Sequence, residues 1–171
     1  EARNANAQGE LAVTIRDLIK SSLRMRPDRI LIGEVRGSEA IDLLQALNTG
    51  HDGSISTGHA NSPVDMLSRL ETMVLMGMEI PIQAIRRQIA SGIDIMVHLG
   101  RLRDKSRKVL EILEILGYDS STGEIRTQSL FQFREQGVDS WGNIQGSLVR
   151  TAELSGVQKL QRAGYVPRGA V

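Results

Sequence analysis

The chain of 171 residues contains no cysteine, so it forms neither a disulfide nor a thiolate metal site, which fits a reducing compartment. Aromatic residues make up only 3%, which argues against modules that bind nucleic acids by stacking bases on aromatic side chains. The formal net charge of +1 creates no global field that would attract a polyanion. No apolar run approaches the roughly 20 residues needed to span a bilayer, and no signal peptide is recognisable.

What remains is a globular protein whose core must be built from aliphatic side chains and Met. The length suits one domain of ordinary size, or a compact domain with an appendage. The sequence begins at Glu1, and its first eleven residues show no recognisable helix cap or turn. We therefore expect the chain to be part of a longer protein.

The first half of the sequence predicts alternating helices and short strands. A helix is expected over residues 14–25, with Thr14 and Asp17 as its capping pair, followed by a buried strand at 29–33. A second helix at 38–50, capped by Ser38, leads into a strand at 53–58. This strand, helix and strand must form a right-handed crossover that joins parallel strands.

Two more helices are predicted after the second strand. The first begins at Ser62 as N-cap, with Pro63 at the first helical position and Asp65 completing the capping box, and it ends at Gly77. The second covers residues 80–92. Four methionines of this region fall at helical spacing, which predicts core filling rather than a binding stripe: Met66, Met73, Met76 and Met78.

The sequence changes character after residue 92. Two strands, at 93–102 and 107–119, are expected to form a hairpin through the polar turn at 104–106, and a third strand should follow the turn at Gly123. We predict one domain over residues 1–134, then a polar loop from about 135 to 145 and a short C-terminal helix within 135–171. The predicted fold class is α/β, with a parallel core and an antiparallel hairpin extension.

Glu34 and His59 stand at the carboxyl ends of the two expected parallel strands, where open α/β sheets bind their ligands. If the strands are neighbours, both side chains face one crevice. A carboxylate at the end of an apolar strand is how nucleotide hydrolases place a group beside the metal and the attacking water. Alternatively, Glu34 caps the next turn and pairs with Arg36, and His59 is a polar residue hydrogen-bonded to backbone.

Other polar residues give weaker signals. His51 and His59 lie eight positions apart with a strand between them, which is not a metal-ligand spacing, and we expect no metal site. A basic set near the first helix could bind phosphate, but an ordinary solvated helix face explains it more simply. This set is Arg16, Lys20, Arg24, Arg26 and Arg29.

A phosphate loop is missing from the sequence. The pattern Gly-x-x-x-x-Gly-Lys-Ser/Thr, which wraps phosphates with backbone N–H groups, requires a Gly-Lys pair, and the chain has none. The stretch from Gly100 to Ser106 imitates the pattern most closely, but it lacks the second glycine and leads into a hairpin. The chain therefore carries no visible nucleotide cradle.

The two motifs nevertheless resemble one known family. The segment "ILIGEVRG" is similar to the atypical Walker B segment of the secretion ATPase superfamily, the motors of type II and type IV secretion and pilus assembly, and "TGHDGSISTGHANS" is similar to its histidine box. The quoted segments are residues 30–37 and 49–62, and we assign the two motifs to residues 29–37 and 50–62, in the family's order. The continuation to about Phe133 most resembles the Tad/Flp pilus branch, the CpaF-type ATPases.

The resemblance implies a role for individual residues. Glu34 matches the catalytic glutamate, His59 the histidine that couples the γ-phosphate to domain movement, and Arg36 the arginine beside the Walker B segment. His51 matches the first histidine of the box, so Arg36 and His51 are expected on the nucleotide side. Gly33 replaces the usual Walker B aspartate, which makes Glu34 mainly a base that activates water.

The resemblance also implies the setting. It predicts the C-terminal half of a RecA-like P-loop NTPase core, working as a hexamer with ATP and Mg²⁺ at the cytoplasmic face of the inner membrane, against pilus or secretion platform proteins. No nucleic-acid partner is expected. Two alternatives stay open: a non-hydrolytic assembly or binding fragment of such a motor, and, less favoured, a RecA-like nucleic-acid motor.

Overall fold

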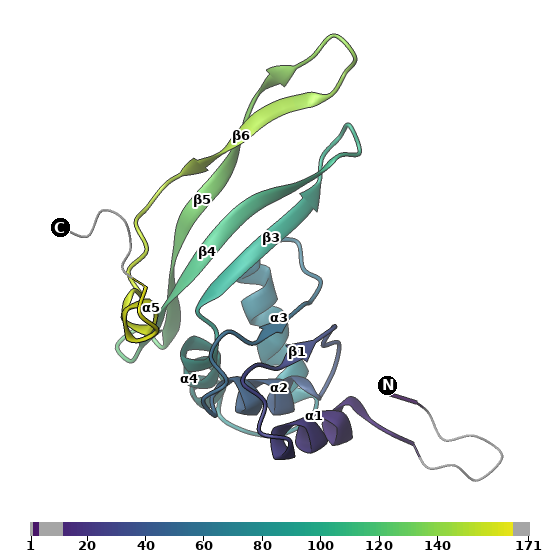
Figure 1. Ribbon diagram of the computed structural model, residues 1–171, viewed down its shortest axis with the longest axis vertical. Coiled ribbons are helices and arrows are strands. Elements are labelled where there is room, and N and C mark those ends of the chain that lie inside the picture. Colours follow the sequence, from purple (N-terminus) through teal and green to yellow (C-terminus); the bar gives the residue numbers. More distant parts are fainter. Residues whose placement is uncertain (1, 4–11, 166–171) are drawn as a thin grey trace. The chain divides into compact units, whose positions relative to one another are not determined.

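A computed structural model describes residues 2–3 and 12–165 of the chain (Figure 1). The chain divides into two compact units, residues 1–92 and residues 93–171. Within the described residues, unit 1 contains four helices and two short strands, and unit 2 contains a four-stranded sheet and a short helix. The division after Gly92 differs from the expected boundary at residue 134, which lies inside a strand of unit 2.

The first helix, α1, covers Ile15–Arg24 and begins as the sequence predicts. The Thr14 hydroxyl accepts the backbone N–H of Asp17, and the Asp17 carboxylate accepts the N–H of Thr14, so two otherwise unpaired donors are satisfied. One face of the helix buries Ile19 against Ile30 and Ala46. This small apolar cluster fixes α1 beside the strand that carries the site.

Strands β1 (Leu31–Ile32) and β2 (Ile55–Ser56) pair in parallel, which confirms the predicted crossover. Each strand is shorter than expected, because among the described residues each has only the other as a neighbour. The Ser54 hydroxyl accepts the N–H of Ile30 at 2.8 Å, which fixes the start of the pair.

Helix α2 (Ala40–Leu47) lies between these strands in sequence and contacts α1, α3 (Pro63–Leu75) and α4 (Ile82–Gly92). It is buried on most sides, as its apolar sequence predicts. The prediction that Ser38 caps α2 is wrong. Glu39 occupies the N-cap position in helical geometry, and its carboxylate instead accepts backbone N–H groups of the preceding turn.

Helix α3 begins as predicted, since the Ser62 hydroxyl accepts the N–H of Asp65 at 3.0 Å and Pro63 occupies the first turn. The methionines only partly fill the core. Met73 is 2% exposed, whereas Met76 and Met78 are 69% and 43% exposed, so the core prediction is wrong for these two. They follow the last turn of α3, where the helical face no longer points inward.

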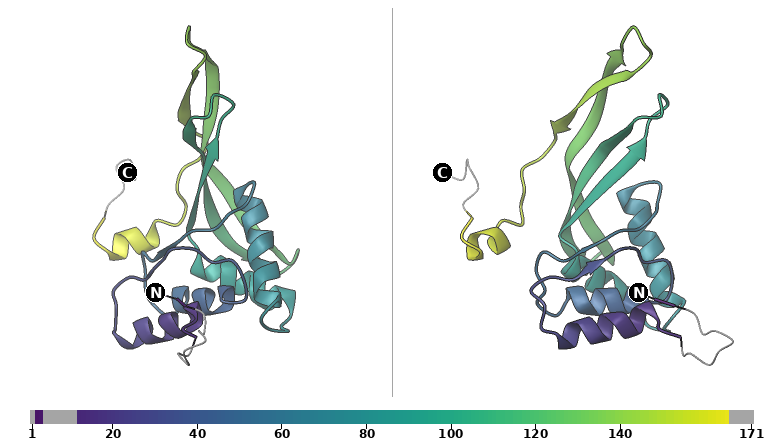
Figure 2. Two further views of the ribbon diagram at one scale, coloured as in Figure 1. Left: turned by 90° about the vertical axis from the view of Figure 1, so that its right-hand side faces the viewer. Right: turned by 45° about the vertical axis from the view of Figure 1, so that its right-hand side comes forward.

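Unit 2 is an antiparallel meander in the order β3-β4-β5-β6. Its strands are β3 (Ile95–Arg101), β4 (Arg107–Asp119), β5 (Glu124–Val138) and β6 (Ile144–Arg150), followed by α5 (Gln158–Arg162). The hairpins at 104–106 and Gly123 and the terminal helix confirm the predictions. Figure 2 shows the sheet as one long twisted ribbon.

The loop predicted over 135–145 is wrong, because β5 continues to Val138 and β6 begins at Ile144. Gly142 within this segment, and Gly146 just after it, serve a hairpin instead. Gly142 turns the chain with φ of +84°, and a Cβ on Gly146 would lie 2.5 Å from the Phe133 ring and from a β5 carbonyl oxygen.

Candidate functional site

The loops that follow β1 and β2 are tied together beyond the strand ladder. The backbone N–H of Val35 donates to the carbonyl of Thr57 at 3.3 Å, and the Thr57 hydroxyl donates to the carbonyl of Gly33. The carboxyl ends of parallel strands meet at one edge of a sheet, and these bonds extend that meeting by several residues. As a result, the side chains of Glu34 and His59 lie close together.

The Glu34 carboxylate contacts two cationic or ionisable groups, one through each oxygen. Arg36 Nη2 lies 2.6 Å from Oε2, and His59 Nε2 lies 3.1 Å from Oε1. The Glu34 side chain is 23% exposed, against 75% for Arg36 and 79% for His59. The structure thus contains both the shared crevice and the Glu34–Arg36 pairing that the sequence left as alternatives.

The electrostatics of the site favour an ionised carboxylate. The hydrogen bond from Arg36 is the largest influence and holds the pKa of Glu34 below its ordinary value. Partial burial opposes this effect, whereas the charges of Arg36, His59 and Arg69 add to it. In return, the carboxylate raises the pKa of Arg36. Glu34 is therefore a carboxylate at neutral pH, able to accept a proton.

The turn that positions Arg36 is stabilised by hydrogen bonds to the side chain of Glu39. The Glu39 carboxylate accepts the N–H of Arg36 at 2.9 Å and that of Gly37 at 3.2 Å. Burial opposes ionisation of Glu39, but these N–H groups and the charge of Arg16 outweigh it and lower its pKa. This role of Glu39 was not predicted, because Ser38, one residue earlier, was expected to cap the helix.

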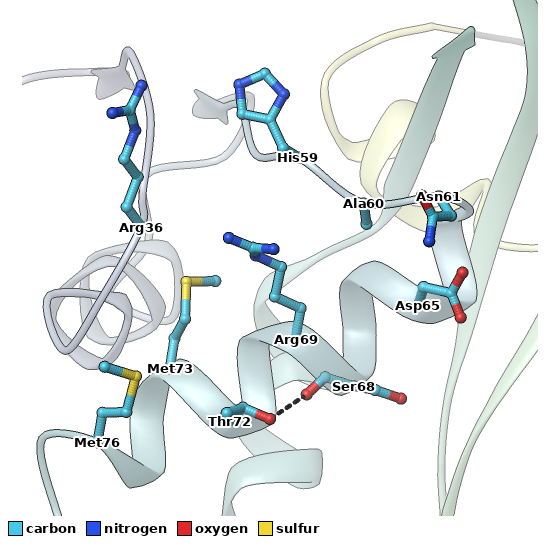
Figure 3. Close-up of a pocket in the computed structure, with 10 residues that line it drawn as sticks. All are labelled: Arg36, His59, Ala60, Asn61, Asp65, Ser68, Arg69, Thr72, Met73 and Met76. Atoms are coloured by element: carbon cyan, nitrogen blue, oxygen red, sulfur yellow. Dashed lines mark hydrogen bonds between the residues drawn. The ribbon is translucent and has the colours of Figure 1, made fainter.

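An open pocket of about 630 Å³ lies between the loop at His59 and helix α3. Glu34 does not line it, but both partners of its carboxylate, Arg36 and His59, do. Figure 3 shows the guanidinium of Arg36 and the imidazole of His59 on the loops, with the guanidinium of Arg69 pointing toward them from α3. Asp65 lines the far end. The pocket therefore presents three nitrogen-rich side chains to whatever enters it, which suits a phosphate or another small anion.

Arg69 is the residue of this site that sequence reasoning missed. It lies on α3, three and four positions from Met66 and Met73, and so shares their helical face. Both methionines point toward the interior, at least in part. Arg69 itself is exposed, and an exposed cation on an amphipathic helix gives no signal in the sequence; the basic residues of α1 were the set considered for phosphate binding. Of those, Arg16 pairs with the buried Asp42 at 2.7 Å.

His51 lies apart from this pocket. Its Nδ1 is 3.2 Å from the Thr49 hydroxyl and 3.3 Å from the carbonyl of Ala46, at the C-terminal end of α2. Its own carbonyl accepts the Ser54 hydroxyl at 2.7 Å. These contacts shape the turn between α2 and β2. The structure brings together Glu34, Arg36 and His59, but His51 is not among the pocket's lining residues.

Comparison with known proteins gives the same family as the two motifs. The type II/IV secretion system protein family matches residues 1–160. The chain belongs to this family.

Curated relatives of this secretion family share the part of the chain that holds the site. A putative conjugal transfer protein of Mycobacterium tuberculosis is 45% identical over 111 residues, which cover 65% of this chain and 31% of that protein. The type IV secretion system protein VirB11 of Brucella suis is 40% identical over 98 residues, 56% of this chain and 27% of that protein. The chain therefore spans about a third of the length of such relatives.

A solved structure supports the fold. The VirB11 ATPase from the Brucella suis type IV secretion system, in complex with sulphate, matches with a TM-score of 0.56 and 39% identity. The match covers 58% of this chain and 31% of that one. The α/β fold class, with a parallel pair and an antiparallel sheet, is confirmed by this similarity.

Two kinds of feature are absent from the described residues. No three His, Asp or Glu side chains within 2–3 and 12–165 come together in a way that would hold a metal ion. None of the helices in that part of the chain has both the length and the apolar character of a bilayer-spanning segment.

Proposed function

We propose that this secretion-family chain supplies the catalytic carboxylate and the phosphate-facing side chains of an ATPase that powers secretion or pilus assembly. The observation that carries the proposal is the ionised Glu34 at the end of β1, held between Arg36 and His59 beside a cationic pocket. The motor would use ATP with Mg²⁺, and the branch would be that of the Tad pilus, the CpaF-type ATPases.

The residues present fit the phosphate end of a nucleotide. Arg36, Arg69 and His59 line the pocket and would bind the terminal phosphate oxygens through N–H donors. Mg²⁺ would enter with the nucleotide, because protein sites for this ion add one or two carboxylates to phosphate oxygens. When bound, the metal and nucleotide supply a polarised phosphoryl group open to in-line attack by water.

Each side chain then has a defined task. Glu34 accepts a proton from the attacking water, and Arg36 keeps Glu34 ionised by lowering its pKa. His59 contacts the carboxylate directly, so movement of its loop would follow a change in the charge at the pocket. His51, as part of the same histidine box, would shape the loop between α2 and β2 from the end of α2.

The setting of the motor is part of the proposal. A hexamer of the longer protein, on the cytoplasmic face of the cell membrane, would act on platform proteins of a pilus or secretion system. The VirB11 and conjugal transfer relatives support this setting. A nucleic-acid motor is less favoured, because the net charge is +1 and aromatic residues are scarce.

The decisive experiment replaces Glu34 with Gln in the intact protein. The amide has the same shape but accepts no proton, and a positioned general base contributes about 10²–10⁴-fold to a rate. We expect ATP turnover to fall by that factor while nucleotide affinity changes little. Turnover and affinity are measured on the same preparation.

A matched control is Glu79→Gln, which removes an exposed carboxylate from the segment between α3 and α4, outside the cluster of Glu34, Arg36 and His59. This variant should keep normal turnover. Near-normal turnover in Glu34→Gln would remove Glu34 from the catalytic role.

A further inference from the structure

The two outer hairpin turns of unit 2 lie at the same end of the sheet (Figures 1 and 2). We call residues 101–108 and 138–143 the hairpin tips. The backbone N–H of Ile144 donates to Asp104 Oδ2 at 2.7 Å, and Arg103 forms an ion pair with Glu135. These contacts hold the tips together as a unit.

The hairpin tips are strongly basic, although the chain as a whole is nearly neutral. Residues 101–108 contain five Lys and Arg and a single acid, Asp104. Asp104 is occupied by the Ser106 and Ile144 donors, which lower its pKa. Four exposed cations, Arg101, Lys105, Arg107 and Lys108, form no ion pair with any described residue. The two tips together contain five Lys and Arg against two acids, Asp104 and Asp139, so they keep an excess of positive charge.

A tryptophan projects from the neighbouring tip. Trp141 is the one Trp of the chain and is 86% exposed, and Val138 beside the turn is 51% exposed. The turn itself is well defined, because the Asp139 carboxylate accepts the N–H of Trp141 at 2.9 Å and of Asn143 at 2.8 Å. A large side chain held out on a fixed turn has no structural use within unit 2, which suggests a binding role.

We propose that the hairpin tips dock on an anionic phospholipid surface. Exposed Lys and Arg are attracted to acidic headgroups, and an indole, with an apolar body and one N–H donor, prefers the boundary between headgroups and acyl chains. Neither signal alone gives stable binding, but a basic patch together with an apolar anchor does. Two protruding turns also suit a flat surface better than a groove in a partner.

The proposal goes beyond the ATPase and does not depend on it. The hairpin tips belong to unit 2, and the Glu34 pocket belongs to unit 1, so lipid binding can be measured without nucleotide. Failure of one proposal leaves the other standing.

The single tryptophan provides a direct test with the full 171-residue chain. Vesicles of phosphatidylcholine with phosphatidylglycerol should shift the Trp141 emission to shorter wavelength and protect it from a soluble quencher. Vesicles of phosphatidylcholine alone should do neither. Binding is quantified in parallel by co-sedimentation with the vesicles.

Substitutions distinguish the contribution of the basic residues from that of Trp141. The triple variant Lys105→Asn, Arg107→Gln, Lys108→Gln should lose about a hundredfold in vesicle affinity, since each basic residue contributes roughly fivefold. Trp141→Ser should lose about tenfold, and Trp141→Tyr should retain most of the binding. A control triple, Lys20→Gln, Arg24→Gln, Arg126→Gln, removes the same charge elsewhere and should bind normally. Circular dichroism verifies that each variant is folded.

Three results would overturn the proposal. One is an unshifted Trp141 emission with acidic vesicles, and another is an equal loss of affinity in the control triple. The third is a spectral shift with soluble poly-glutamate or heparin but not with vesicles, which would indicate an acidic macromolecule as partner.

Discussion

At the scale of single residues, Glu34 depends on two partners that differ in kind. Arg36 is permanently charged and makes the shorter contact, whereas His59 carries charge only when protonated. Both partners are mostly exposed, so solvent and salt screen them more than a buried pair. Arg36 therefore has the largest influence on the pKa of Glu34.

Arg36→Gln should move the acid limb of ATP turnover in the intact protein to higher pH. The lowered pKa of Glu34 keeps this carboxylate ionised to lower pH than an ordinary Glu, and in the proposed ATPase it would keep the base active over the same range. Without the guanidinium the pKa of Glu34 rises, so activity is lost earlier as the pH falls. The profile of kcat/KM against pH reports this limb for the free enzyme.

The control for this shift is Arg24→Gln, which removes an exposed cation from α1. It should leave the acid limb in place. An unmoved limb in Arg36→Gln would mean that a group other than Glu34 controls it.

The sequence could predict Glu34 and His59 because the end of a parallel strand is defined by the strand itself. It could not predict Arg69, whose approach depends on how α3 packs, nor Glu39, whose carboxylate binds a turn that no local pattern encodes. The histidine box placed His51 and His59 in one motif. The packing of the folded chain places them apart. His51 contacts the end of α2, and His59 lines the pocket.

At the scale of elements, helix caps, apolar periodicity and turn residues were sufficient to predict the helices and the first hairpin. They were not sufficient for the segment 135–145, because its glycines are equally typical of a loop. The folded hairpin is needed to show that Gly146, just after this segment, leaves room for the Phe133 ring of the neighbouring strand. Cross-strand contact is a non-local property, so the β5–β6 hairpin could not be predicted from the segment alone.

Helix α5 depends on one buried carboxylate. Glu114 of β4 is 3% exposed and accepts the backbone N–H groups of Ser155 and Gly156, at 3.0 Å and 2.5 Å, and the Gln128 amide at 2.6 Å. Glu114→Ala would remove the acceptor of the Ser155 and Gly156 N–H groups, at a cost of about 2–4 kcal/mol in unfolding free energy, whereas the Gln128 amide keeps the Glu153 carbonyl and the Ser155 hydroxyl as partners. We also expect faster hydrogen exchange across residues 155–162, measured by mass spectrometry.

Glu111→Ala provides the comparison, because Glu111 is half-buried on the same strand. It should leave exchange at residues 155–162 unchanged. Unaltered exchange in Glu114→Ala would show that the segment before α5 is held by other contacts, such as the ion pair between Lys159 and Asp94.

At the scale of the whole molecule, the two units are stabilised differently. The buried apolar residues of unit 2 are few: Leu113, Ile115, Leu130 and Ile144. Its long strand ladders therefore contribute much of its order. Unit 1 holds the larger aliphatic core, packed around α2, and with it the rigid support that a catalytic site requires.

The arrangement of unit 1 leads to a prediction for the full 171-residue chain. Its pocket offers side-chain cations for a terminal phosphate, but the sequence contains no Gly-Lys pair and hence no loop of backbone N–H groups for the remaining phosphates. Isothermal titration with ATP and Mg²⁺ should therefore show no binding in the micromolar range, which corresponds to about −8 kcal/mol. The intact protein should bind ATP under the same conditions. Micromolar affinity in the chain alone would contradict this prediction, because side chains of the Glu34 pocket would then suffice to hold the nucleotide.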